Sequence, residues 1–268
     1  DSLSINLNTG VWCDFASGDK GSDPISLIAC VKQMSQGDSA KYLDTYLSSD
    51  AIKHIEKKEY KKPNTEEWEA LPFAPDDAPE PNTKHYKFGT PSKTWNYYNK
   101  DKKLVGIICR FDRADGSGKE VIPITWCVSE SGKTGWRWKS FAKPRCLFNS
   151  HLLNEDLNKV VLIVEGEKTA ESAQRLVPHL AVTTWAGGAK AVELADWSML
   201  QNRKVVIWGD NDEAGVRASV TIQAYLPQAR IVQPPMRLKG WDLADAEQEG
   251  WTTEQVRSLS LIHISEPT

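Results

Sequence analysis

The stretch VVIWGDNDEAG, residues 205–215, places three acids directly after a run of branched and aromatic residues. The apolar run, residues 205–209, predicts a buried strand. Asp210, Asp212 and Glu213 follow it, and their mutual repulsion destabilises a fold unless a cation or a helix terminus takes up the charge. The stretch therefore predicts an ion site or a helix start at the end of a core strand.

Residues 159–235 alternate between apolar runs and amphipathic segments, which predicts alternating strands and helices. The strands are expected in KVVLIVEG, AVTTW, KVVIWGD and ARIVQPP. Continuous apolar strands joined by helical crossovers require a parallel sheet that is covered on both faces. The expected fold class is α/β: a parallel sheet with helices on both faces, preceded by a smaller strand-rich α+β subdomain.

Two of the predicted strands end in acids, Glu165 on the first and the pair Asp210 and Asp212 on the third. Ligands of an open parallel sheet gather at the carboxyl ends of its strands. Residues i and i+2 of an extended chain point to the same side, so the two aspartates can converge. Hard carboxylate oxygens suit magnesium. The alternative is that Asp212 caps the following helix and Glu165 only starts a turn.

The strings EGEKTA and, about 45 residues later, GDNDEAG resemble the Toprim domain of bacterial and phage primases, topoisomerases and some nucleases. The string Asp-x-Asp-x-Ala-Gly is similar to the primase version, which favours a primase core of phage or mobile-element type. The resemblance implies that Glu165, Asp210 and Asp212 are catalytic and bind Mg2+ or Mn2+, with Glu165 also able to act as general acid or base. It further implies magnesium-dependent nucleotidyl transfer from nucleoside triphosphates on single-stranded DNA.

Two further strings extend this resemblance. TTWAGGAKAV, residues 183–192, occupies the place of a glycine-rich loop. The residues expected to contact nucleotide phosphates are Lys168, Gly187, Gly188 and Lys190. LKGWDLADA, residues 238–246, implies that Asp242, and less surely Asp245, joins the metal site. The alternative is a helix capped by Asp242. Thr169 stands where replicative primases carry an acid, which argues against a complete second metal site.

Residues 134–149, TGWRWKSFAKPRCLFN, interleave aromatic and basic residues. In a strand, Trp136 and Trp138 share one face while the basic residues occupy the other. This predicts a single-stranded DNA surface that stacks bases on tryptophan. Its phosphate contacts are expected from Arg110, Arg137, Lys139, Lys143 and Arg145. The alternative is that both tryptophans belong to the core and the basic face is only solvated.

Composition restricts the possible classes of protein. The chain has 268 residues, 40% hydrophobic and 26% charged, with a net charge of −3, so it carries no global basic footprint. No apolar run approaches the roughly 20 residues of a membrane span. The five cysteines form no C-x-x-C pair, which favours a reducing cytoplasm, the host's if the protein is phage-encoded.

Five segments are expected. Residues 1–50 predict two short strands and a helix that begins near Pro24, capped by Asp23. They resemble the tail half of a primase zinc module without its ligands, since Cys13 stands alone, so zinc is not expected. Residues 51–93 predict a solvated connector, 94–150 the strand-rich subdomain, and 151–250 the Toprim domain. In the tail, 251–268, the last eleven residues resemble translated sequencing-adapter sequence.

Two other functions compete with the primase. The first is a Toprim-type magnesium nuclease. The second is a non-catalytic nucleic-acid or nucleotide-binding module of a replication protein. A topoisomerase is disfavoured because no DNA-cleaving tyrosine domain is recognisable. A replicative helicase, fused or separate, is the expected protein partner.

Overall fold

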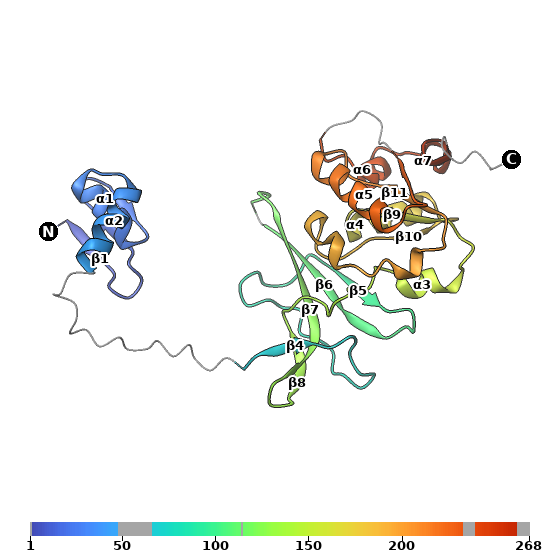
Figure 1. The fold of residues 1–268 in the computed structure, drawn as a ribbon, viewed down its shortest axis with the longest axis horizontal. Coiled ribbons are helices and arrows are strands. Elements are labelled where there is room, and N and C mark those ends of the chain that lie inside the picture. Colours follow the sequence, from blue (N-terminus) through green and yellow to red (C-terminus); the bar gives the residue numbers. More distant parts are fainter. Residues whose placement is uncertain (1, 48–65, 114, 233–238, 262–268) are drawn as a thin grey trace. The chain divides into compact units, whose positions relative to one another are not determined.

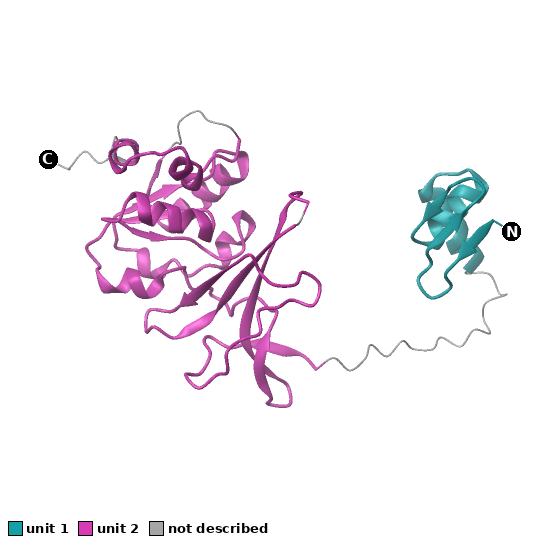
Figure 2. Ribbon diagram, turned by 180° about the vertical axis from the view of Figure 1, so that it is seen from behind, with its two compact units in different colours: residues 1–65 teal, residues 66–268 magenta. Residues whose placement is uncertain are grey.

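The computed structural model describes residues 2–47, 66–113, 115–232 and 239–261. They fall into two compact units, residues 1–65 and residues 66–268 (Figures 1 and 2). Within the described residues, no helix has the length and apolar character needed to cross a membrane.

The first unit is a small three-stranded antiparallel sheet with two helices. Its strands β1 (Leu3–Ile5), β2 (Trp12–Asp14) and β3 (Lys20–Gly21) pair in sequence order, followed by α1 (Pro24–Lys32) and α2 (Gln36–Leu47). The cap predicted for α1 is confirmed: the Asp23 carboxylate accepts a hydrogen bond from the Ser26 amide at 2.9 Å.

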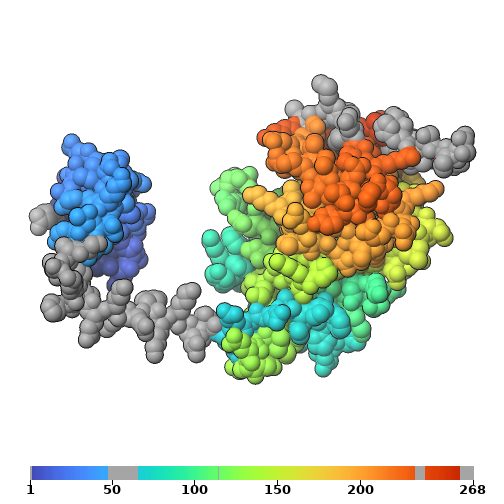
Figure 3. Space-filling view, viewed as in Figure 1, coloured from blue at the N-terminus to red at the C-terminus, as the bar shows by residue number. Residues whose placement is uncertain are grey.

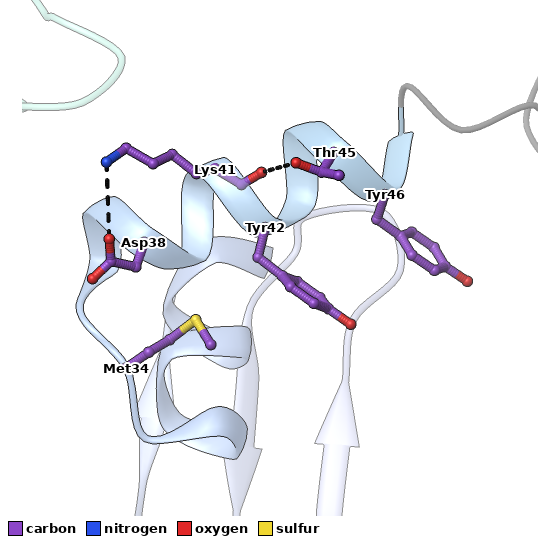
Figure 4. Close-up of a pocket in the computed structure, with 6 residues that line it drawn as sticks. All are labelled: Met34, Asp38, Lys41, Tyr42, Thr45 and Tyr46. Atoms are coloured by element: carbon purple, nitrogen blue, oxygen red, sulfur yellow. Dashed lines mark hydrogen bonds and ion pairs between the residues drawn. The ribbon is translucent and has the colours of Figure 1, made fainter.

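Few side chains of this unit are buried. Trp12 is the buried anchor, and its Nε1 donates to the Ser26 hydroxyl at 3.0 Å. Phe15 and Leu7 are exposed, and α1 contributes no buried residue. The open hollow in Figure 4 lies over α2 and is lined by Met34, Asp38, Lys41, Tyr42, Thr45 and Tyr46. This unit therefore has a weak core of its own.

The second unit opens with an antiparallel sheet. Its strands are β4 (Trp68–Ala70), β5 (Lys93–Tyr98), β6 (Leu104–Asp112), β7 (Lys119–Ser129) and β8 (Thr134–Arg137). The order is β4-β7-β6-β5, with β8 also paired to β7. This sheet confirms the strand-rich subdomain expected before the parallel sheet.

The expectation of a solvated connector at 51–93 needs correction. Residues 51–65 lie outside the described residues, but β4 pairs with β7 and residues 85–89 form a tight hairpin. The physical reason is that β4 gains its hydrogen bonds from a strand about 60 residues away, which local composition does not reveal. The Pro-rich stretch runs over the sheet instead of standing free.

The parallel sheet predicted from the apolar runs is confirmed. Its order is β10-β9-β11-β12, and every neighbouring pair is parallel. The strands are β9 (Val161–Val164), β10 (Ala181–Thr183), β11 (Val205–Trp208) and β12 (Arg230–Val232). The helical elements are α3 (Ser150–Glu155), α4 (Glu167–Leu176), η2 (Ala189–Leu194), η3 (Ser198–Leu200), α5 (Glu213–Tyr225), α6 (Leu243–Gln248) and α7 (Thr253–Leu261).

Helices cover both faces of this sheet, as expected for continuous apolar strands. Leu162 and Val206 on one face belong to the same cluster as the apolar side chains of α4 and α6. Ile163 and Ile207 on the other face share a cluster with α5 and η2. Helix α5 lies on the side of the sheet that faces the viewer in Figure 1, and the orange atoms of this part of the chain lie at the front of the space-filling view in Figure 3. The α/β fold class is therefore correct.

Arg203 fastens the loop after α3 to the sheet. Arg203 is only 7% exposed, and its guanidinium donates to the carbonyls of Leu153, Asp156 and Lys159 at 2.6, 2.9 and 2.9 Å. Arg203→Met keeps the volume but leaves three carbonyls without donors, so we expect a loss of about 2–3 kcal/mol in unfolding free energy. Urea denaturation of the variant and the wild type measures this loss of unfolding free energy. Arg217→Met, which removes an exposed pair with Glu213, should cost under about 0.5 kcal/mol, and equal losses in both variants would contradict the fastening role.

Candidate active site

The acids of the two sequence motifs lie at one edge of the parallel sheet. Strands β9 and β11 are direct parallel neighbours, with Val164 opposite Trp208. Glu165 follows β9 immediately, and Asp210 follows β11 after one glycine. Because the two strands end in register, the acids emerge side by side at the carboxyl edge.

The electrostatics of Asp210 show how closely the acids are grouped. Burial, and then the charges of Glu165, Asp242 and Asp212, raise the pKa of Asp210 to about 8. Burial and the charge of Asp212 also raise the pKa of Glu165. The Oδ1 atom of Asp210 is buried and has no hydrogen-bond partner among the described residues. For Asp210, burial and the neighbouring acids therefore outweigh the one positive charge that acts on it, that of Lys119.

Two of the four acids also cap helices, as the alternative interpretation of each motif predicted. Asp212 Oδ1 accepts from the Gly215 amide at 2.8 Å at the start of α5. Asp242 Oδ1 accepts from the amides of Ala244 and Asp245 at 2.6 and 3.0 Å at the start of α6. The capping role of both residues is established, and it involves one carboxylate oxygen of each.

The second oxygen of Asp242 is engaged as well. Thr169 Oγ1 donates to Asp242 Oδ2 at 2.8 Å, and Asp245 completes a capping box by accepting from the Asp242 amide at 3.1 Å. Asp242 thus accepts more hydrogen bonds than the other acids of the group. The Asp245 carboxylate accepts a hydrogen bond at the start of α6. Asp210 and Glu165 remain the least satisfied.

The chemistry of the donors fits a hard divalent cation. Within the described ranges, no three His, Cys, Asp or Glu side chains are already arranged around a common ion position. The donors are nonetheless carboxylate oxygens, which magnesium prefers, and the orphaned Asp210 Oδ1 lacks the partner that a cation would provide. Magnesium bound by Glu165, Asp210, Asp212 and Asp242 remains a prediction.

A cleft of about 780 Å³ opens beside these acids, with the antiparallel sheet as its other wall. All four residues predicted to contact phosphates line it: Lys168, Gly187, Gly188 and Lys190. So do Arg110 and Arg145 from the predicted nucleic-acid surface. The apolar part of the wall is formed by Trp95, Ile108, Val121, Pro123 and Phe141. The cleft thus combines acids, cations and an apolar wall.

The remaining residues of the predicted nucleic-acid surface lie elsewhere. The Arg137 guanidinium stacks on the Trp68 ring at 3.6 Å and donates to the Trp136 carbonyl. Lys139 and Lys143 are exposed and do not line the cleft. Of the basic residues predicted at 134–149, only Arg145 therefore lines the cleft beside the acids.

The two tryptophans of that stretch are half-buried rather than free for stacking. Trp138 packs edge-on against Phe111 with ring centroids 6.0 Å apart, and Trp136 packs edge-on against Trp126 at 5.4 Å. Trp136 Nε1 also donates to the Pro79 carbonyl at 2.6 Å. Their position agrees with the alternative that they belong to the core, since both adjoin the buried cluster of this sheet face.

Sequence reasoning missed Lys119 and the role of Glu167. Lys119 begins β7 and lines the cleft, and its charge lowers the pKa of Glu165, Glu167 and Asp210 against the larger effect of burial. Glu167, only 8% exposed, accepts from the hydroxyl of buried Tyr97 at 2.7 Å, which ties α4 to β5. Glu167 is part of the EGEKTA string, so its position was visible in the sequence. Lys119 and Tyr97 belong to no recognisable motif, and no local sequence signal could have identified them.

Glycines bring the acid-bearing loop and helix α5 into close contact. A Cβ on Gly209 would lie 2.5 Å from Ser219 Oγ and 2.7 Å from the Gly215 carbonyl oxygen. A Cβ on Gly215 would lie 2.3 Å from the Asp210 carbonyl oxygen. Both glycines of the GDNDEAG string lie where the acid-bearing loop and the start of α5 come too close together for a side chain. This close contact fixes the position of Asp210.

Comparison with known proteins places the chain beside a family whose function has not been assigned. The family model "Domain of unknown function (DUF6371)" matches residues 74–211. No curated protein matches the chain.

Several similar solved structures are primases. The primase fragment of the bacteriophage T7 primase-helicase protein is 13% identical over 97% of this chain and 93% of that chain, with a TM-score of 0.45. The Aquifex aeolicus primase (zinc-binding and RNA polymerase domains) is 16% identical over 96% and 74%, with a TM-score of 0.44. A DNA primase domain from Pseudomonas aeruginosa is 11% identical over 63% and 50%, with a TM-score of 0.44. These likenesses are loose, so the function must be inferred from the chain's own residues.

Proposed function

The chain belongs to the family described as Domain of unknown function (DUF6371), and we propose that it is a primase-type nucleotidyltransferase acting on single-stranded DNA. The observation that carries the proposal is the acid group at the ends of β9 and β11, which borders a cleft lined by cations and glycines. The motif resemblance of EGEKTA and GDNDEAG to Toprim primases supports the same activity.

The acids would hold the metal and the cations would hold the nucleotide. Glu165 and Asp210 are the principal metal ligands in this proposal, joined by the uncapped oxygen of Asp212 and by Asp242. Bound there, magnesium would neutralise phosphate charge at the reacting centre. Lys168 and Lys190, with the backbone of the Gly187–Gly188 turn, would bind the triphosphate, and Arg145 and Lys119 would add to the positive charge of the cleft.

The proposed reaction joins two nucleotides. The primer 3′-oxygen forms a bond to the α-phosphorus, the bond from that phosphorus to the bridging oxygen breaks, and pyrophosphate leaves. Glu165 would accept the proton of the 3′-hydroxyl. The apolar wall around Val121 and Pro123 offers a surface for the paired bases, since it faces the same cleft. Positioning and charge neutralisation supply most of the rate in such reactions.

One assay separates the proposed activity from its two competitors. The protein is incubated with labelled nucleoside triphosphates, Mg2+ or Mn2+, and single-stranded DNA, beside a reaction without template. Template-dependent oligonucleotides are the expected product. Degradation of labelled DNA in the absence of nucleotides would instead identify a nuclease, and DNA binding without either reaction would identify a non-catalytic module. Parallel reactions with ribo- and deoxynucleotides establish which substrate is used.

A replicative helicase remains the proposed protein partner, on the resemblance to primases alone.

A further inference from the structure

The hairpin of residues 84–89 holds an aromatic side chain outside the fold. His85 and Gly89 exchange two backbone hydrogen bonds at 2.8 and 2.9 Å, which closes a tight turn. Tyr86 lies in this turn and is 91% exposed. The sequence of the turn, KHYKF at 84–88, contains two lysines and three aromatic rings. The closed turn therefore presents the Tyr86 ring to solvent.

His85 supports Tyr86 from below. His85 is only 6% exposed, and its ring lies 4.4 Å from the Tyr86 ring and 4.9 Å from the Phe88 ring, centroid to centroid. Its Nδ1 accepts from the amides of Lys87 and Phe88 at 3.2 and 3.3 Å, which fixes its orientation. Trp138 packs edge-on against it at 4.8 Å. Tyr86 is therefore the outer member of an aromatic stack.

The stack is anchored in the antiparallel sheet on the face opposite the cleft. Phe111 contacts both His85 and Phe88, with centroids 5.8 and 5.7 Å apart. Side chains alternate along β6, and Arg110, the neighbour of Phe111, lines the cleft. Tyr86 thus belongs to a surface separate from the reaction cleft, in the same compact unit.

Two lysines stand within two residues of Tyr86 in the sequence. Lys84 and Lys87 flank the stack and are exposed. Within the part of the chain that the structure describes, neither lysine takes part in an ion pair, and Lys87 Nζ lies 5.1 Å from the centre of the Phe88 ring. A supported aromatic ring with two exposed lysines close to it in the sequence matches the chemistry of single-stranded nucleic acid, where bases stack and phosphates follow at each nucleotide.

We propose that this hairpin, residues 84–89, is a single-stranded DNA surface on which Tyr86 stacks with a base while Lys84 and Lys87 contact the adjacent phosphates. The inference rests on the proposed function, because it supplies a contact for the DNA outside the cleft. It replaces the tryptophan stacking expected from residues 136–138: Trp138 packs inward and supports His85, while Tyr86 is the ring left open.

Fluorescence anisotropy with a labelled oligo-dT tests the surface in the full chain. Tyr86→Ala should weaken binding at least about fivefold, the lower end of aromatic–base stacking. Tyr86→Phe should bind as the wild type does, because stacking needs the ring and not the hydroxyl. Tyr225→Ala, which removes another exposed tyrosine from α5, is the matched control and should leave binding unchanged. Unchanged thermal unfolding of each variant shows that the fold is intact.

Two further arms distinguish stacking from charge. On an abasic oligonucleotide of the same length, the wild type and Tyr86→Ala should bind equally, since no base remains to stack. In Lys84→Ala/Lys87→Ala, the salt dependence of oligo-dT binding should flatten by a slope of about 0.7 per lost phosphate contact. Wild-type affinity of Tyr86→Ala for oligo-dT would overturn the proposal.

Failure of this surface and failure of the proposed function give different results. If the wild type carries out template-dependent synthesis and Tyr86→Ala binds DNA normally, the proposed role of the hairpin is wrong and the proposed primase activity stands. If affinity for oligo-dT depends on Tyr86 but no synthesis is detected, the proposed role of the hairpin stands and the proposed primase activity is wrong.

Discussion

Replacing Asp210 by Asn should lower template-dependent synthesis at least about a hundredfold, roughly 3 kcal/mol of transition-state stabilisation. The variant keeps the shape of the side chain but removes one charge from the acid group that would hold the metal. Binding of single-stranded DNA should persist, because the substitution keeps the shape of the side chain and adds no negative charge beside the cleft. Synthesis at the wild-type rate would refute the assignment of Asp210 as a metal ligand.

The same substitution should stabilise the metal-free protein. The pKa of Asp210 is about 8 in the folded chain, raised chiefly by burial and next by Glu165, against roughly 3.9 for an unfolded aspartate. Folding therefore favours the protonated acid. Its stabilising contribution is complete below about pH 4 and is lost as the pH rises towards 8, at no more than about 1.4 kcal/mol per pH unit.

Melting temperatures in EDTA at pH 5, 7 and 8 measure this effect. The wild type should lose stability across the series, and Asp210→Asn should lose less, so that the difference is largest at pH 8. Magnesium should restore part of the wild-type loss and have less effect on the variant. Asp101→Asn, which removes a charge from an exposed turn, is the control. A metal-free variant less stable than the wild type at pH 8 would mean that Asp210 has a structural role.

Sequence patterns predicted the parallel sheet because its signal is local. Each buried strand is a short apolar run, and two of the helices around it begin at a capping aspartate, Asp212 and Asp242. Strand β4 escaped prediction because its three residues gain their hydrogen bonds from β7, far along the chain. The stack of Tyr86 on His85 escaped for the same reason, since its support comes from Phe111 and Trp138.

The positions of the acids at the sheet edge could be predicted from the sequence, but the hydrogen bonds that each acid makes could not. Glu165 and Asp210 follow strands that can be recognised from the sequence, and register alone brings them together. Asp212 and Asp242 both cap helices, and the cap uses one of the two carboxylate oxygens of each. The bond from Thr169 to the second oxygen of Asp242 connects residues 73 positions apart, and no local pattern announces it.

Gly215→Ala should impair both stability and synthesis, although Gly215 carries no chemistry. The new Cβ would lie 2.3 Å from the Asp210 carbonyl oxygen and 2.7 Å from its amide nitrogen. Both atoms are backbone, so either the start of α5 or the Asp210 peptide must move. Overpacking of this kind costs about 1–3 kcal/mol, and the helix-propensity gain of alanine offsets at most about 1 kcal/mol of it.

Synthesis should fall further than stability, because the displaced residue is the one placed at the centre of the acid group. A shift of about 1 Å in a reacting group costs on the order of a hundredfold in rate. Gly37→Ala is the matched control: it also lies in a helix, but its Cβ would meet no atom closer than Ser35 Oγ at 3.8 Å. That variant should be neutral or slightly stabilising. Urea unfolding and the template-dependent assay measure the two effects, and a fully active, fully stable Gly215→Ala would show that the position of Asp210 does not depend on this close backbone contact.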